Sequence, residues 1–113
     1  MHTEIREVQG VTIIRPEGKI TIGEGDLRMR EAVEKALAEG KKKLIVDLGK
    51  VSFMDSSGVG ELVGCFTTVM NRGGKLKLLN LTKKIHDLLT ITQLVTVFEV
   101  HKDEQAAIAS FGS

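Results

Sequence analysis

Short β-prone runs alternate with amphipathic segments of helical spacing along most of this sequence. Five β-prone runs stand out, at 4–8, 11–16, 44–46, 75–79 and 95–100. Gln9-Gly10 separates the first two and suits a tight hairpin turn, because glycine adopts positive φ without strain. The third run is apolar without alternation, which is typical of a parallel strand covered on both faces. The pattern predicts an α/β fold with a mixed, mostly parallel β-sheet, one antiparallel edge strand and packed helices.

Four helices are predicted between and after these strands. The first lies between an N-cap at Asp26 and a terminating Gly40, and its inward face comprises Met29, Val33, Ala36 and Leu37. The inward face of the second comprises Val59, Leu62, Val63, Phe66 and Met70. The third and fourth span 82–91 and 103–111. The predicted order is ββαβαβαβα, with Pro16 at the end of the second strand, where its missing N–H does least harm.

Length and charge restrict the possible functions. A chain of 113 residues fits one domain over 1–113. Sixteen basic and fifteen acidic residues leave a net charge of +1, which gives no general attraction for a polyanion. The chain also lacks the Trp and Tyr residues on which single-strand binders stack bases. Nucleic acid is therefore not expected as a partner.

The cysteine count points to a reducing compartment. Cys65 has no second cysteine to pair with, and it is expected to be a buried, inert thiol in the second helix. The three histidines, His2, His86 and His101, fall in different elements, so no metal site is predicted. No apolar run approaches the roughly 18 to 20 residues of a membrane span, and the first residues do not resemble an export signal. We expect a cytoplasmic protein without membrane insertion.

The segment 51–60 carries the strongest functional signal, because it joins a buried strand to the most amphipathic helix. Asp55, Ser56 and Ser57 can each cap a helix, and capping alone would explain one of them. Three in a row exceed that need, and Gly58 and Gly60 are expected to leave the backbone bare and approachable. A helix N-terminus stabilises added negative charge, so the segment suits a phosphate on a serine better than hydrolysis.

The run from Val51 to Gly60 resembles the STAS domain of bacterial anti-sigma factor antagonists. The resemblance covers nearly the whole chain and includes Leu44-Ile45-Val46-Asp47-Leu48 before this run and Gly73-Gly74-Lys75-Leu76 after it. The resemblance implies a non-enzymatic module without a cofactor. It implies that Ser56 is phosphorylated by a partner that is both a serine kinase and an anti-sigma factor. The unphosphorylated form would bind that partner and release sigma, and a PP2C-type phosphatase would reset the switch. Ser57 is the alternative acceptor.

The resemblance also assigns a partner-binding surface. Its expected members are Asp55, Ser56, Ser57, Gly58, Thr21, Gly23 and Gly25. Thr21 departs from the family pattern, since Asp often follows the second strand in such antagonists. Either the partner has a matched difference or this chain belongs to a divergent branch.

Three other functions compete with this interpretation. A STAS subunit or scaffold of a lipid transporter or sensory complex would use the fold without a phosphoswitch. A catalytic Ser56 or Ser57 would need an oriented base, and no histidine lies near the segment in sequence. A nucleotide loop at Gly23 and Gly25 would lack the third glycine and the Gly-Lys-Ser/Thr signature.

Overall fold

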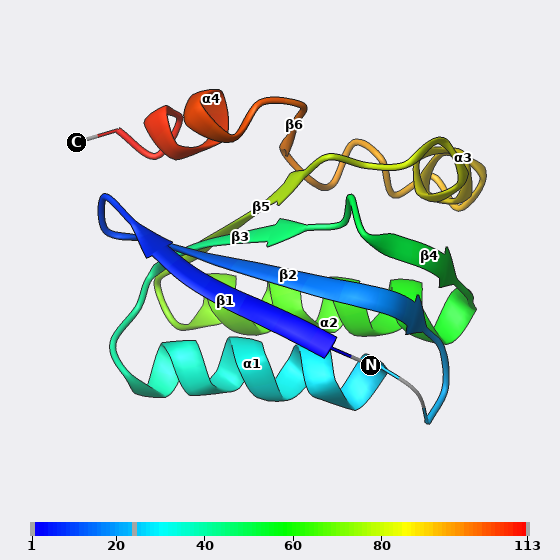
Figure 1. Cartoon of the computed structure of the whole chain (residues 1–113), viewed down its shortest axis with the longest axis horizontal. Coiled ribbons are helices and arrows are strands. Elements are labelled where there is room, and N and C mark those ends of the chain that lie inside the picture. Colours follow the sequence, from blue (N-terminus) through cyan, green and yellow to red (C-terminus); the bar gives the residue numbers. More distant parts are fainter. Residues whose placement is uncertain (1, 24, 113) are drawn as a thin grey trace.

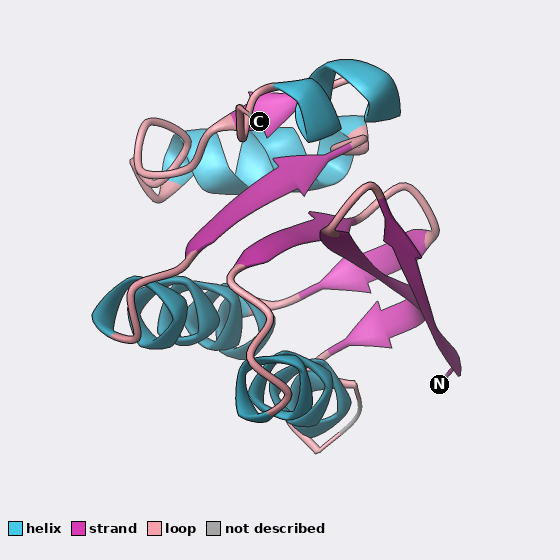
Figure 2. Ribbon diagram, turned by 90° about the vertical axis from the view of Figure 1, so that its left-hand side faces the viewer, coloured by secondary structure: helices cyan, strands magenta, loops and turns pink. Residues whose placement is uncertain are grey.

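A twisted sheet with helices on both of its faces forms the fold (Figures 1 and 2). The computed structural model describes residues 2–23 and 25–112. The elements in chain order are β1 (His2–Val8), β2 (Val11–Ile20), α1 (Asp26–Ala38), β3 (Lys43–Asp47), β4 (Val51–Met54), α2 (Ser56–Asn71), β5 (Lys75–Leu79), α3 (Lys83–Ile91), β6 (Val100–His101) and α4 (Glu104–Ala109). Figure 2 shows α1 and α2 side by side on one face and α4 on the opposite face.

The strand order is β1-β2-β3-β5-β6, with β4 paired to β2 outside that path. The β1–β2 pair is antiparallel and the other pairs are parallel, so the predicted mixed sheet with an antiparallel edge is confirmed. The hairpin turn is confirmed as well, because Gln9 and Gly10 have φ of 53° and 81°. Two positive φ values in succession give the tight turn whose twist matches that of the flanking strands.

Strand β2 changes partner along its length. Its residues 12–14 pair with β3, and its residues 18–20 pair with β4. Pro16 lies in the middle of the strand between these two ladders, and not at its end as expected. A proline is tolerated there because neither parallel ladder includes its position, so no pairing on that side needs its missing N–H.

Two expectations for the strands are wrong. Val51–Met54, expected as a connection, forms β4, and its burial does not alternate because Ser52 and Phe53 are both exposed. The predicted strand at 95–100 is mostly turn, and only Val100–His101 pairs with β5. There the chain turns so that the Phe98 ring enters the core, in an edge-to-face contact with Phe66 at a centroid distance of 5.2 Å.

Helix α1 buries the predicted face, Met29, Val33, Ala36 and Leu37. Its start differs from expectation, because the helix begins at Asp26 and Gly25 is the N-cap residue, with φ 86° and no side-chain cap. A left-handed backbone of this kind favours glycine over aspartate. Gly40, with φ 83°, follows the helix as predicted.

Helix α2 buries a face slightly rotated from the predicted one. Val59 and Leu62 are buried as expected, but Met70 is 48% exposed and Val69 occupies the core instead. The 3.6-residue period explains the shift, since positions 62, 65 and 69 stay on one face while position 70 rotates away from it. Val63 and Phe66 are partly buried against the same core.

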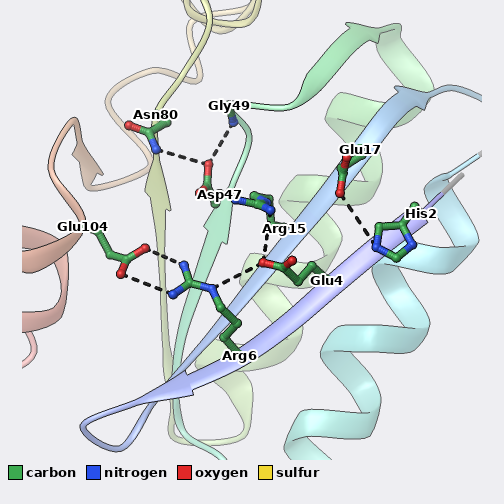
Figure 3. Close-up of polar contacts among 9 residues, drawn as sticks. All are labelled: His2, Glu4, Arg6, Arg15, Glu17, Asp47, Gly49, Asn80 and Glu104. Carbon is green, nitrogen blue, oxygen red and sulfur yellow. Dashed lines mark hydrogen bonds and ion pairs between the residues drawn. The ribbon is translucent and has the colours of Figure 1, made fainter.

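The opposite face of the sheet carries charges as well as apolar side chains. Arg6 on β1 contacts Glu104 on α4 at 2.5 Å, which ties the edge strand to the last helix (Figure 3). Glu4 lies between Arg6 and Arg15, with oxygen-to-nitrogen distances of 3.5 and 3.1 Å (Figure 3). Asp47 is buried among them at the end of β3. This face is therefore held in part by ion pairs.

Candidate functional site

The site begins where β2 and β4 end side by side, at the right of Figure 1. Ile20 pairs with Met54, and the Asp55 backbone N–H donates to the Ile20 carbonyl at 3.4 Å. Parallel strands bring their carboxyl ends to one edge of a sheet, which is where open α/β folds place functional loops. The chain enters α2 immediately after this edge.

Asp55 fixes the first turn of α2. Its backbone is extended, and its Oδ1 accepts a hydrogen bond from the Gly58 N–H at 2.9 Å. Its carbonyl accepts from the Val59 N–H at 3.0 Å. The capping role predicted for this residue is confirmed. One carboxylate oxygen is thus committed to the helix, and the start of α2 is held in a defined position.

Gly58 sets how closely α2 approaches the strands. A Cβ at this position would lie 2.3 Å from the Ile20 carbonyl oxygen and 2.6 Å from Met54 Cγ. The expectation of a bare, approachable backbone at Gly58 is therefore wrong, because this backbone is buried against β2 and β4. It is correct for Gly60, where a Cβ would meet nothing within 4 Å.

The two serines differ in exposure. Ser56, the first residue of α2, is exposed, whereas Ser57 is half-buried. The amides of the first helical residues have no acceptor within their own helix, and α2 is 16 residues long. Negative charge beside these amides is favourable, typically by about 0.3 to 1 kcal/mol at an exposed site. Ser56 is the more exposed of the two hydroxyl residues, and it lies at the end of the helix where added negative charge is favourable.

The loop after β2 leaves the sheet next to the same helix start. Thr21 directly follows Ile20, is half-buried and forms an isolated bridge with Gly25. Gly23 is exposed with φ 74°, and Gly25 is buried. Glu24, between these glycines, lies outside the described residues. The structure therefore places the predicted loop residues at the same end of the sheet as Asp55 and Ser56.

A catalytic serine would need a base such as histidine, and the two histidines outside the first strand have acidic neighbours instead. His101 Nε2 lies 2.6 Å from Glu99 Oε2, and His86 Nδ1 lies 3.8 Å from Asp87 Oδ1. Within residues 2–23 and 25–112, no group of three or more His, Cys, Asp or Glu side chains could hold a metal ion. No helix of this described part is long and apolar enough to span a bilayer.

Cys65 is buried as predicted, at 3% exposure. Burial, together with the nearby Glu61 carboxylate, raises the pKa of its thiol to about 12. Arg30 acts in the opposite direction, but its guanidinium is held by Glu61 at 2.7 and 2.8 Å. A thiol with so high a pKa is a poor nucleophile at neutral pH.

The sequence interpretation missed the two residues beneath Gly58. Ile20 and Met54 come from separate strands, and together they form the surface against which the helix backbone packs. Glycine inside a helix lowers the stability of the helix, so its presence three residues after an N-cap is a sequence signal that another part of the chain packs closely against the helix backbone there. The signal does not identify the partners, because these are brought together only by β2–β4 pairing.

Comparison with known proteins gives a consistent result. The STAS domain family matches residues 2–107. The chain is 25% identical to the anti-sigma F factor antagonist of Paenibacillus polymyxa over 96% of this chain and 92% of that protein. It is 38% identical to the anti-sigma-B factor antagonist of Bacillus subtilis (64% of this chain, 66% of that protein) and 34% to that of Listeria monocytogenes (68% of each).

Solved structures share the fold at lower identity. The Bacillus cell fate determinant SpoIIAA in its phosphorylated form superposes with a TM-score of 0.74 at 22% identity, covering 97% of this chain and 99% of that one. An anti-sigma factor antagonist from Mycobacterium paratuberculosis gives 0.84 at 18% identity, covering 96% and 92%. A sulfate transporter family protein from Wolinella succinogenes gives 0.77 at 20% identity, covering 91% and 85%.

Proposed function

This chain belongs to the STAS domain family and, within it, to the bacterial anti-sigma factor antagonists, and from that premise we propose that it is a phosphorylation-controlled switch. In this proposal it binds an anti-sigma factor that is also a serine kinase, and binding releases a sigma factor. Phosphorylation of Ser56 ends the binding, and a PP2C-type phosphatase restores it. The protein would work in the cytoplasm, without nucleic acid or membrane insertion.

One observation carries the proposal: Ser56 is an exposed hydroxyl residue at a helix start that is capped and closely packed. The Asp55 cap and the Gly58 approach to Ile20 hold the first turn of α2 in place. The hydroxyl can therefore be modified without disturbing buried contacts. The half-buried Ser57 is less accessible, which favours Ser56 as the acceptor.

A phosphate at Ser56 would act on the surface and not on the fold. It adds about 1.5 to 2 negative charges at neutral pH, beside the carboxylate of Asp55. A partner that packs tightly over Ser56 would have to bury this charge, and unpaired buried charge is strongly unfavourable. The free amides of the α2 N-terminus meanwhile compensate part of the charge in the unbound protein.

The partner surface would include Asp55 and the first α2 residues Ser56 and Ser57, together with Thr21 and Gly23 of the loop after β2. Gly58 and Gly25 are buried and would shape this surface from beneath without touching the partner. Thr21 presents a hydroxyl where such antagonists often have a carboxylate. We propose that the anti-sigma factor of this system is matched to that difference. Its contact at Thr21 would be neutral and not cationic.

The alternative is a STAS subunit or scaffold of a lipid transporter or sensory complex, without a phosphoswitch. The likeness to the sulfate transporter family protein is at 20% identity and concerns the fold alone. The relatives from Bacillus subtilis and Listeria monocytogenes, at 38% and 34% identity, are anti-sigma-B factor antagonists, which favours the switch.

The test uses the full chain with each anti-sigma factor of its own genome, purified one at a time. With kinase and ATP, we expect one phosphate on the wild type, none on Ser56→Ala and one on Ser57→Ala. Mass spectrometry measures the phosphate count. Ser56→Asp should lose anti-sigma binding by calorimetry while keeping its melting temperature.

Phosphorylation of Ser56→Ala to the wild-type level would move the acceptor to Ser57 or another hydroxyl. Unchanged binding by Ser56→Asp and by the phosphorylated protein would contradict the charge switch. A wild type that binds none of the anti-sigma factors would favour the transporter or scaffold alternative.

A further inference from the structure

An apolar groove lies between β4 and α3, and the function proposed above does not use it. Its volume is about 330 Å³. Met54 and Ile85 are buried along it, whereas Phe53 is 50% exposed and Ile91 is 78% exposed. Two large apolar side chains exposed to water at one groove are unfavourably solvated, and such a patch is typical of an interaction site.

The groove is continuous with the Ser56 site. Its β4 wall consists of Ser52, Phe53 and Met54, the three residues immediately before Asp55. Among the described residues, β4 pairs with β2 along one edge, and α3 lies beyond its other edge. A partner that binds over Ser56 can therefore also contact the groove, because no other helix or strand of the described residues lies between them.

The Ser56 surface needs an additional source of affinity. At the start of α2 it is a small polar patch of Asp55, Ser56 and Ser57, and small polar side chains offer little apolar area to bury. The adjoining loop adds the Ile22 side chain, which is 77% exposed. Most of the free energy at protein interfaces comes from a few large side chains that fill apolar pockets, surrounded by a polar rim. The groove has that composition, with Lys84 and Asp87 of α3 among its exposed lining residues.

We propose that the β4–α3 groove is the anchoring site for the same anti-sigma factor that contacts Ser56. The inference rests on the proposed function. The occupant is one large apolar side chain of that partner, flanked by polar residues that complement Lys84 and Asp87. Contact at Ser56 then controls binding through charge, and the groove supplies the apolar part of the affinity.

The two roles can be separated kinetically. The groove is built by β4 and α3 and does not include the hydroxyl that receives the phosphate. Loss of an anchor weakens formation of the complex but leaves the geometry of the bound Ser56 unchanged. A groove variant should therefore raise KM for phosphorylation by the anti-sigma kinase and leave kcat nearly unchanged.

The test compares Phe53→Ser and Ile91→Ser with Met70→Ser as the matched control. Met70 is 48% exposed, similar to Phe53, but it lies 14 residues along α2 from Ser56, roughly 21 Å away at 1.5 Å per residue. Each variant is titrated by calorimetry into the anti-sigma factor that binds the wild type. We expect each groove variant to bind at least 10-fold more weakly and Met70→Ser to bind within about 2-fold.

Each outcome decides a different question. Groove variants that bind within 2-fold of a binding-competent wild type would overturn the anchor and leave the proposed function intact. A wild type that binds no anti-sigma factor would overturn the function itself. A wild-type dimer in light scattering that Ile91→Asp converts to monomer would assign the groove to a second copy of this chain and would also overturn the anchor. Ile91 is exposed enough that its replacement leaves the fold unchanged, which the melting temperature checks.

Discussion

Helices α1 and α2 cover one face of the sheet mainly with apolar side chains. The short α4 covers the other face with a few apolar contacts and an ion pair to Arg6, and further ion pairs join the strands there. The α1–α2 core includes Ile14, Leu44, Val46 and Leu62, all fully buried. The core under α4 is smaller and centres on Ile13, Ile45, Leu79, Ala107 and Ile108.

The α4 face depends on a buried lysine. Lys77 is 6% exposed, and its Nζ donates to the Ser110 carbonyl at 3.0 Å and hydroxyl at 2.8 Å. It also lies 2.9 Å from Glu99 and 4.4 Å from the centre of the Phe111 ring. One cation thus holds the C-terminal segment through directional contacts. The apolar face positions the site through shape, whereas the charged face attaches a terminal helix through groups that can titrate.

The largest expected effect separates the two cores. Leu62→Ala on α2 should destabilise the protein by about 2 to 5 kcal/mol, because a fully buried leucine leaves a cavity. Ile108→Ala should cost less, because α4 has six residues and can loosen locally while the rest stays folded. Urea denaturation measures both, and hydrogen exchange reports the local opening of α4. Equal losses would show that the two faces contribute alike.

A smaller effect tests the close approach that positions the site. Gly58→Ala should cost about 1 to 3 kcal/mol, because its Cβ would collide with the Ile20 carbonyl and cannot be accommodated without a backbone shift. Gly60→Ala is the matched control two residues along the same helix. Its Cβ meets open space, so the alanine should stabilise α2 by about 0.5 to 1 kcal/mol. The same sign for both, in thermal unfolding, would contradict the packing described for Gly58.

The smallest effect is specific to the charged face. The hydrogen bond from Lys77, with that from His101, lowers the pKa of Glu99 from its ordinary 4.5 to about 2. A lowered carboxyl pKa stabilises the fold above pH 4.5, and that contribution is lost as the pH falls from 4.5 to about 2. Glu99 is half exposed, so the contribution should stay under about 1 kcal/mol after solvent screening.

Melting curves of the wild type and Glu99→Gln check this. The wild type should be the more stable of the two at pH 6, and the difference should shrink to nothing near pH 2. Leu62→Ala should remain destabilised by the same amount across this range, since no charge is involved. A Glu99→Gln deficit that persists at pH 2 would assign the role of Glu99 to packing instead.

Local patterns in the sequence were enough to predict much of this molecule. Apolar periodicity located α1 and the inward residues Val33 and Leu37, and Gln9-Gly10 predicted the hairpin, because these features depend only on neighbours along the chain. The Asp55 cap and the start of α2 followed from the same kind of signal. At 95–100 the β-prone pattern predicted a strand, whereas most of this segment forms a turn.

What the sequence by itself determined was the order of most elements, the antiparallel edge and the segment that carries Ser56. Only the tertiary structure decided that β4 exists, that Gly58 is packed against Ile20 and Met54, that Lys77 is buried, and that Ser56 is more exposed than Ser57. The physical reason is range. Capping, turns and amphipathic spacing are set by residues a few positions apart, whereas strand pairing and burial depend on groups that folding brings together from distant positions, such as Lys77 and Ser110.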